Sequence, residues 1–246
     1  MLTLALSFFV IALLYATVGF GGGSSYTALL AVSNISYTLI PKVSLICNLL
    51  VVSGGCYHFF KSGHLSKKLI TPFILASVPF AFLGGLYRLE ESTFYALLTF
   101  SLVLCGLRIL IIRDKRVEEI TPPTFGVSLV VGALLGLLSG MVGIGGGIFL
   151  SPLLINMGWA RSKDAAAVAS VFILVNSLAG LGGQFSKSLA MPAPEFYLPL
   201  FLAVVLGGQI GSRISNHSRA SYWLIQKGTG ILTLVISARL LFKSLS

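Results

Sequence analysis

Long apolar segments recur along almost the whole chain, and they constrain its fold more than any other feature. Most of them are long enough for a helix to cross the roughly 30 Å hydrocarbon core of a bilayer. Backbone groups in lipid must pair within the protein, and the alternating pattern of barrel strands is absent, so the sequence predicts helices. We therefore expect an all-α, polytopic transmembrane helical bundle. The segments lie at residues 1–18, 37–60, 69–86, 92–112, 125–142, 164–185, 196–211 and 221–242.

The composition argues against a soluble globular protein. Hydrophobic residues make up 56% of the 246 residues and charged residues only 10%, and the mean hydropathy is +0.96. A formal net charge of +10 would suggest a nucleic-acid partner in a soluble chain. Here the basic residues cluster in short loops between apolar segments, which is typical of contact with the inner leaflet of a membrane. We expect no nucleic-acid partner.

A glycine-rich string occurs twice in the chain. LLYATVGFGGG at residues 13–23 matches LLSGMVGIGGG at residues 137–147 in seven of eleven positions without a gap. Small and polar residues follow each string in the same order, among them Asn48 and Asn176. The sequence therefore predicts two copies of one unit. We expect a first transmembrane repeat at residues 1–112, a cytoplasmic linker at residues 113–123 and a second transmembrane repeat at residues 124–246.

Each glycine string is followed by an apolar piece that is too short to cross a bilayer. The pieces are residues 24–32 and 148–157, and helices of that length span only about 13–15 Å. If each piece continues the preceding helix, the two repeats run parallel through the membrane. If it folds back as a separate half-length helix, the repeats are inverted. The inverted arrangement places more Lys and Arg on the cytoplasmic side, so the positive-inside rule favours it.

Inverted repeats with broken helices are typical of secondary transporters that bind their substrate near the bilayer midplane, between the two halves. A helix that begins after GFGGG or GIGGG would present unpaired N–H groups and the positive end of its dipole. Such an end binds anions, and glycine lets the backbone approach the ligand closely. The alternative is that the glycines only allow close helix packing. Their recurrence before a short piece in both copies favours the anion site.

The candidate substrate-binding residues are the glycines of both strings, the hydroxyls beside them and the polar residues of the segments that follow. An amide in hydrocarbon is costly unless protein or ligand pairs with it, which draws attention to Asn48 and Asn176. The alternative role for these polar side chains is to join neighbouring helices by hydrogen bonds. The full set is Gly21, Gly22, Gly23, Ser24, Ser25, Ser44, Asn48, Gly145, Gly146, Gly147, Ser170 and Asn176.

The charged residues favour an anion over a cation as the substrate. All seven acidic residues fall in loops or at the ends of apolar segments, whereas a cation pathway would usually need a carboxylate at membrane depth. Lys42, Arg161 and Lys163 lie near the ends of segments, where they could draw anions towards the two mouths or only anchor the helices at the interface.

Signals for a metal, a cofactor or catalysis are missing from the sequence. The three histidines and three cysteines show no metal-ligand spacing, so we expect no metal and no other cofactor. GFGGGSS lacks the lysine of a phosphate-binding loop, and neither GxSxG nor HExxH occurs. The sequence does not predict an enzyme.

VGFGGGSSYTALL, LSGMVGIGGGIFLSPLL and the asparagine downstream of each make the chain resemble the sulfite exporter TauE/SafE family of membrane permeases. The resemblance covers nearly the whole chain, including the two-copy organisation and the basic central linker. It implies a multi-pass protein of a bacterial or archaeal inner membrane that moves small sulfur-containing or organic anions such as sulfite, sulfonates or sulfoacetate. The direction of transport does not transfer. The residues carried over are Gly21, Gly22, Gly23, Gly145, Gly146, Gly147, Asn48 and Asn176.

These observations together predict a secondary transporter that works by alternating access, with an anion bound near the bilayer midplane. An anion channel and a membrane scaffold or subunit without transport activity are the alternatives. The expected partners are the small anion and the lipid bilayer. A coupling proton or ion and a homo-oligomer are left open by the sequence.

Overall fold

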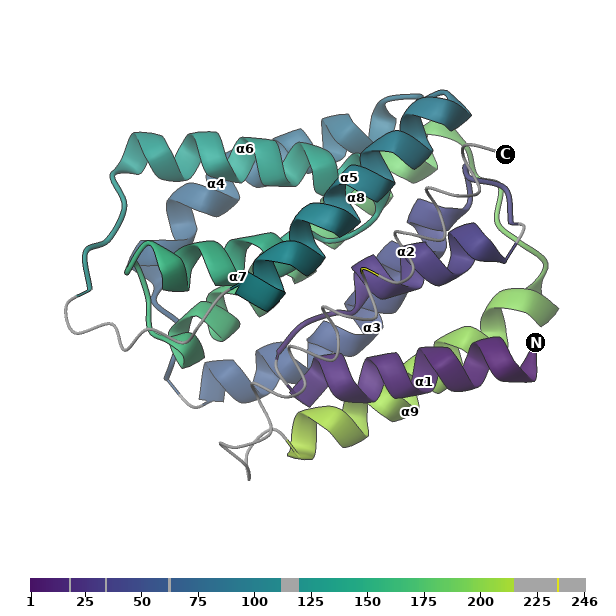
Figure 1. The fold of residues 1–246 in the computed structure, drawn as a ribbon, viewed down its shortest axis with the longest axis horizontal. Coiled ribbons are helices and arrows are strands. Elements are labelled where there is room, and N and C mark those ends of the chain that lie inside the picture. Colours follow the sequence, from purple (N-terminus) through teal and green to yellow (C-terminus); the bar gives the residue numbers. More distant parts are fainter. Residues whose placement is uncertain (18, 34, 62, 112–119, 215–233, 235–246) are drawn as a thin grey trace.

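The fold was taken from a computed structural model, which describes residues 1–17, 19–33, 35–61, 63–111, 120–214 and 234. Every regular element in these residues is an α-helix, which confirms the predicted all-α class (Figure 1). The last predicted segment, except residue 234, and most of the predicted linker lie outside the described residues. The helices are α1 (Leu2–Thr17), α2 (Gly23–Val32), α3 (Ile40–Lys61), α4 (Lys67–Leu86), α5 (Glu91–Ile111), α6 (Phe125–Val142), α7 (Gly147–Asn156), α8 (Ser162–Lys187) and α9 (Pro194–Ile214).

Four of the described helices, α4, α6, α8 and α9, are long and apolar enough to cross a membrane. Shorter apolar stretches lie in α1, α3, α5 and α7. Many large apolar side chains on α4, α6 and α9 are exposed, as expected for helix faces that contact lipid rather than water. The helices therefore have the lengths and surfaces of a polytopic membrane bundle.

Both glycine strings interrupt the helical backbone. The first break separates α1 from α2, the second separates α6 from α7, and α2 and α7 have ten residues each. Gly22 and Gly146 precede these short helices with φ of 83° and 75°, a left-handed conformation that glycine adopts without steric cost. Each short helix begins one residue earlier than the sequence predicts. They leave the middle of the bundle towards opposite sides (Figure 1).

Glycines set the close packing of the long helices and reveal their directions. Along α6, Gly132 lies against the backbone of Phe73 in α4, and Gly140 lies against that of Ala81. Both numbers rise together along the contact, so these two helices run parallel. Gly207 and Gly211 of α9 likewise lie against the backbone of Phe9 and Leu13 in α1, so α9 runs parallel to α1. Figure 1 shows α1 running from the N-terminus in the opposite direction to α6. The inverted arrangement requires these opposite directions, although the repeat relation itself stays a prediction.

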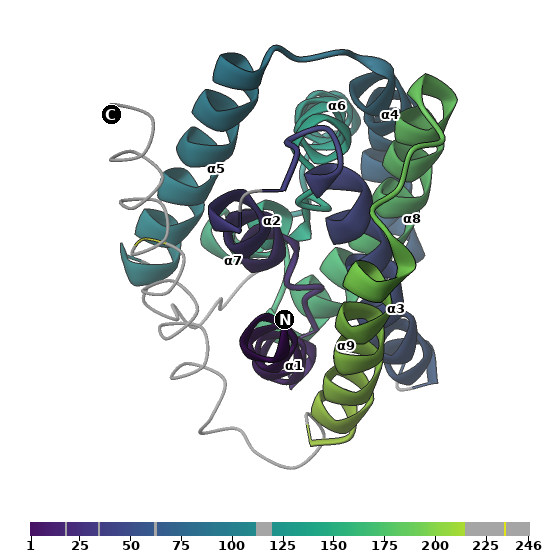
Figure 2. The ribbon, with the colours of Figure 1, turned by 90° about the vertical axis from the view of Figure 1, so that its right-hand side faces the viewer.

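The ends of the helices gather at two faces of the bundle. At one face, which we call the linker face, the α3–α4 loop meets the start of α8 through His64 Nδ1 and Asp164 Oδ1, 3.3 Å apart. At the other, which we call the far face, Lys187 Nζ at the end of α8 donates to the carbonyl of Tyr87 in the α4–α5 loop at 3.1 Å. Viewed from one end, α2 and α7 lie near the middle with the longer helices around them (Figure 2).

The contact between α4 and α6 should depend on Gly140 and not on every glycine of α6. A β-carbon added at Gly140 would overlap the carbonyl oxygen of Ala81, whereas one added at Gly126 would meet nothing within 4 Å. We expect Gly140→Ala to destabilise the protein by about 1–3 kcal/mol through overpacking. Gly126→Ala should be neutral or stabilising, because alanine is the better helix former. Thermal unfolding of both variants in detergent tests this, and equal shifts would contradict it.

Candidate functional site

The two glycine breaks meet inside the bundle. We call residues 19–22 the first loop and residues 143–146 the second loop. A β-carbon added at Gly23, where α2 begins, would lie 2.5 Å from the carbonyl oxygen of Ile144 in the second loop. Both loops are buried. Two segments more than a hundred residues apart in sequence therefore place the starts of α2 and α7 against each other.

Asn48 of α3 lies between the two loops. Its Nδ2 donates to the carbonyl oxygen of Ile144 at 3.2 Å. A β-carbon added at Gly21 would lie 2.5 Å from Asn48 Oδ1, and one added at Gly145 would lie 2.7 Å from Asn48 Nδ2. Only glycine leaves room for this amide on both sides. Among the described residues, the buried Asn48 Oδ1 has no hydrogen-bond partner, so this oxygen marks a position for a donor on water or a ligand.

One serine of α3 and one of α8 each bind the loop of the other predicted repeat. Ser44 Oγ of α3 donates to the carbonyl oxygens of Gly143, at 2.8 Å, and Gly23, at 3.2 Å. Ser170 Oγ of α8 donates to the carbonyl oxygen of Gly19 at 2.6 Å. The hydroxyl protons of both serines are therefore engaged by backbone carbonyls. In this structure each serine therefore holds a loop of the other predicted repeat.

The remaining polar candidates point elsewhere. Ser25 Oγ lies 2.9 Å and Ser24 Oγ 3.4 Å from Tyr15 Oη, so both hydroxyls face α1. Asn176 Nδ2 donates at 2.8 Å to Phe172 O within its own helix. Its buried Oδ1 has no hydrogen-bond partner among the described residues, as is the case for Asn48 Oδ1. The loop glycines of the described chain closely approach Asn48 and not Asn176, although the two asparagines occupy matching places in the two copies.

Backbone amides are the largest set of unused donors at the site. The first N–H groups of each short helix bond back to its N-cap glycine, as Ser25 and Tyr26 do to Gly22. In the described ranges, no hydrogen bond is found for the amides of residues 21–24 or 144–146. Unpaired amides at two helix starts, together with the positive ends of two helix dipoles, form an arrangement that can bind an anion.

Two buried hydroxyls near the loops were missed by the sequence analysis as site residues. Within the described part of the chain, neither Tyr26 Oη nor Ser177 Oγ has a hydrogen-bond partner. The phenol oxygen would lie 3.0 Å from a β-carbon added at Gly22, and the serine oxygen 3.3 Å from one added at Gly145. Seven-residue spacing places Ser177 on the same helix face as Ser170, although Ser177 is not in the candidate set. Tyr26 could have been identified as a polar residue in the first turn of a buried half-helix.

The described residues offer no site for a metal ion. They contain no group of three or more His, Cys, Asp or Glu side chains that could hold one. Among them, no acidic side chain is buried. The donors at the loops are thus N–H and O–H groups, which suit an anion rather than a cation.

Comparison with known proteins identifies the family. The sequence profile described as "Sulfite exporter TauE/SafE" matches residues 4–240 of the chain. The chain belongs to the TauE/SafE family. A curated relative, the "Probable membrane transporter protein y4hK" of Sinorhizobium fredii, is 35% identical over 226 residues, which are 90% of each chain. No solved structure matches. This TauE/SafE protein is therefore a multi-pass membrane transporter and not an enzyme.

The two asparagines of this TauE/SafE protein should differ in their effect on stability. Asn48→Ala leaves the buried carbonyl of Ile144 without its donor and empties the space between the loops, at a cost of about 1–3 kcal/mol. Asn176→Ala should cost less, because its bond to Phe172 lies within one helix, where the backbone already pairs that carbonyl. Unfolding midpoints of the purified variants measure the difference. A larger loss in Asn176→Ala would contradict the central position of Asn48.

Proposed function

We propose that this chain is a secondary transporter for small sulfur-containing or organic anions such as sulfite, sulfonates or sulfoacetate. The anion binds near the bilayer midplane at the N-terminal ends of α2 and α7 and moves by alternating access. The observation that carries the proposal is the contact between the two loops, where the amides of residues 21–24 and 144–146 have no partner among the described residues. The family supports transport, and the site supports the charge of the substrate.

The electrostatics of the loops support an anion. Each short helix contributes roughly half an elementary charge of positive sign at its N-terminus. Two such ends meet here, and the hydroxyls of Tyr26 and Ser177 add side-chain donors nearby. In a low-dielectric interior these partial charges are weakly screened. Asn48 Oδ1 is an acceptor, so a water or a protonated group of the substrate is expected beside it.

The way the loops are held supports alternating access. Ser44 and Asn48 of the first predicted repeat bind the second loop, and Ser170 of the second predicted repeat binds the first loop. Movement of one half against the other would therefore change the positions of both loops at once. Inverted repeats that share a central site are the arrangement in which such rocking exposes the site alternately to the two sides.

We also propose that the linker face is cytoplasmic in a bacterial or archaeal inner membrane. Lys67 and Lys68 at the start of α4 are exposed there, as are Arg161 and Lys163 at the start of α8. Basic residues near the ends of spans orient membrane proteins with that side inside.

A flux measurement tests the central site. Purified protein in proteoliposomes should show saturable flux of sulfite or a small sulfonate. Gly21→Ala should reduce it by about tenfold or more, because the new β-carbon displaces the Asn48 amide and fills the space beside the free amides. Gly21 does not have positive φ, so alanine is compatible with its backbone. Gly55→Ala in α3, where a β-carbon meets no described residue within 4 Å, is the matched control.

Each alternative gives a different result in this experiment. Flux that does not saturate would indicate an anion channel. A folded protein that passes none of these anions would support the scaffold. Unchanged flux in Gly21→Ala would contradict the binding site while leaving transport in place.

A labelling experiment tests the membrane orientation. Single cysteines at Ser66 and Ser188 would be introduced after the native cysteines are replaced; Ser66 lies at the linker face and Ser188 at the far face. On intact cells, an impermeant maleimide should label the cysteine at position 188. It should label the cysteine at position 66 only after the cells are permeabilised. The reverse pattern would place the linker face outside. Labelling of both from one side would contradict the helix directions.

A further inference from the structure

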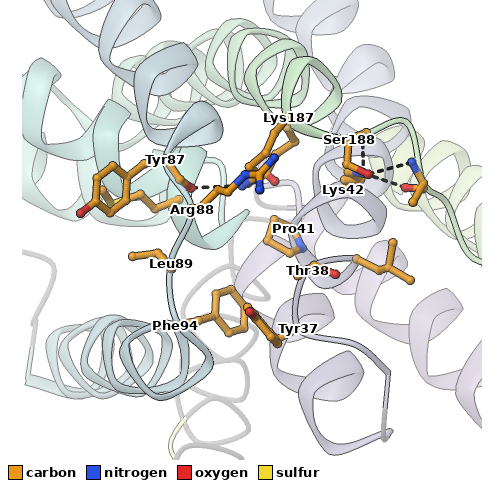
Figure 3. Close-up of a pocket in the computed structure, with 14 residues that line it drawn as sticks. Tyr37, Thr38, Pro41, Lys42, Tyr87, Arg88, Leu89, Phe94, Lys187 and Ser188 are labelled. Atoms are coloured by element: carbon orange, nitrogen blue, oxygen red, sulfur yellow. Dashed lines mark hydrogen bonds between the residues drawn. The ribbon is translucent and has the colours of Figure 1, made fainter.

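A cavity of about 470 Å³ lies at the far face, apart from the two loops (Figure 3). We call it the vestibule. Its walls come from the α2–α3 loop, the first turn of α3, the α4–α5 loop and the end of α8. These segments are distant in sequence, so the cavity exists only in the assembled bundle.

One wall of the vestibule carries three positive charges. Lys42 is only 2% exposed, and its Nζ donates to the carbonyl oxygens of Ser188 and Ala190 at 2.6 and 2.7 Å. Figure 3 shows Arg88 and Lys187 next to each other on the same side of the cavity. No carboxylate lines the vestibule, and the described residues form no ion pair with these cations.

A buried cation whose hydrogen-bond partners are neutral carbonyls has no countercharge, so an anion that enters the cavity would supply one. Lys42 is buried, Lys187 is half-buried and Arg88 is exposed. Together these three charges around one cavity attract an anion and can donate charge-assisted hydrogen bonds to it. Among the described residues, a buried basic side chain occurs at the far face only. At the linker face Arg161 and Lys163 are exposed, and Asp164 is paired with His64.

The opposite wall of the vestibule is apolar. Tyr37 and Phe94 lie across the cavity from Lys187 and Arg88 (Figure 3), with their ring centroids 5.9 Å apart. Met141 also lines the cavity. A cavity with one cationic and one apolar wall fits a ligand with the same division. A bare oxyanion would leave the aromatic wall unused.

The vestibule lies close to the second loop. Pro41, which lines the cavity, packs against Gly143, where an added β-carbon would lie 2.5 Å from the proline Cα. Ser44, one helical turn further along α3, donates to the carbonyl of Gly143. Lys42 and Asn48 are six positions apart in one helix, which corresponds to a rise of about 9 Å.

We propose that the vestibule is a second anion-binding site that holds organic anions with a short apolar group, such as alkanesulfonates, at the far face. The inference rests on the proposed function, since the ligand is of the class the central site would carry. Lys42, Arg88 and Lys187 hold the charged head group, and Tyr37 and Phe94 contact the apolar group. The site holds the anion one to two helical turns from the loops.

Equilibrium binding of propane-1-sulfonate and of sulfite, measured by calorimetry on the whole protein in phosphatidylcholine nanodiscs, tests the site. The test variant is Arg88→Gln/Lys187→Gln, which leaves the buried Lys42 in place. The control variant is Lys67→Gln/Lys163→Gln, which removes the same charge from exposed positions at the linker face. The test variant should weaken propane-1-sulfonate binding by about tenfold or more, and the control by less than about twofold.

The apolar wall has its own test. Wild-type protein should bind propane-1-sulfonate more tightly than sulfite, and Tyr37→Ala should reduce that preference. Equal affinity of the test and control variants for propane-1-sulfonate would overturn the proposal, as would equal affinity of wild-type protein for the two anions.

Flux in proteoliposomes separates this inference from the proposed function. The test variant should raise the KM for propane-1-sulfonate and keep kcat, because the central loops are intact. Saturable flux with an unchanged KM and unchanged binding would overturn the vestibule and keep the transporter. Binding that depends on Arg88 and Lys187 without any flux would support the vestibule and overturn the transporter.

Discussion

The backbone polar groups of the two glycine loops impose the main constraint on this structure. A peptide group inside a bilayer must find a partner within the protein, and a broken helix leaves several without one. The carbonyls of the second loop are paired by Ser44 and Asn48, and the first loop receives Ser170. The protein therefore supplies donors for loop acceptors, whereas the amides of residues 21–24 and 144–146 have no partner among the described residues. This excess of unpaired N–H donors supports an anionic ligand.

Glycine has two separate physical roles in the bundle. Gly22 and Gly146 end the loops with positive φ, so they allow a half-length helix to begin inside the protein. Gly136 and Gly140 lie within a long helix, where the lack of a side chain lets α6 approach the backbone of α4. Gly23 and Gly147 of the two strings are closely packed as well, so close packing and a left-handed backbone occur together at the breaks.

The sequence predicted the all-α class and the positions of both breaks to within one residue, because segment length and glycine strings are local signals. It predicted Asn48 as a substrate-binding residue, and the structure places Asn48 between the two loops. It could not predict that Ser24 and Ser25 turn towards Tyr15, because side-chain direction depends on how α2 packs against α1. The vestibule was beyond sequence reasoning for a related reason. Its cations come from three segments that only the tertiary fold brings together.

The vestibule and the loops differ in the strength of their charges, which supports different roles for the two proposed sites. Full charges lie at the vestibule, where Lys42, Arg88 and Lys187 line one wall of the cavity. At the loops, only partial charges of amides and hydroxyls are present among the described residues. A full cation at the midplane would hold an anion too tightly to release it, since a carrier must bind strongly enough to select and weakly enough to let go. Helix ends provide about half a charge each and meet both demands. In the proposed mechanism, the full charges of the vestibule bind the anion at the far face, and the partial charges of the loops bind it during transport across the membrane.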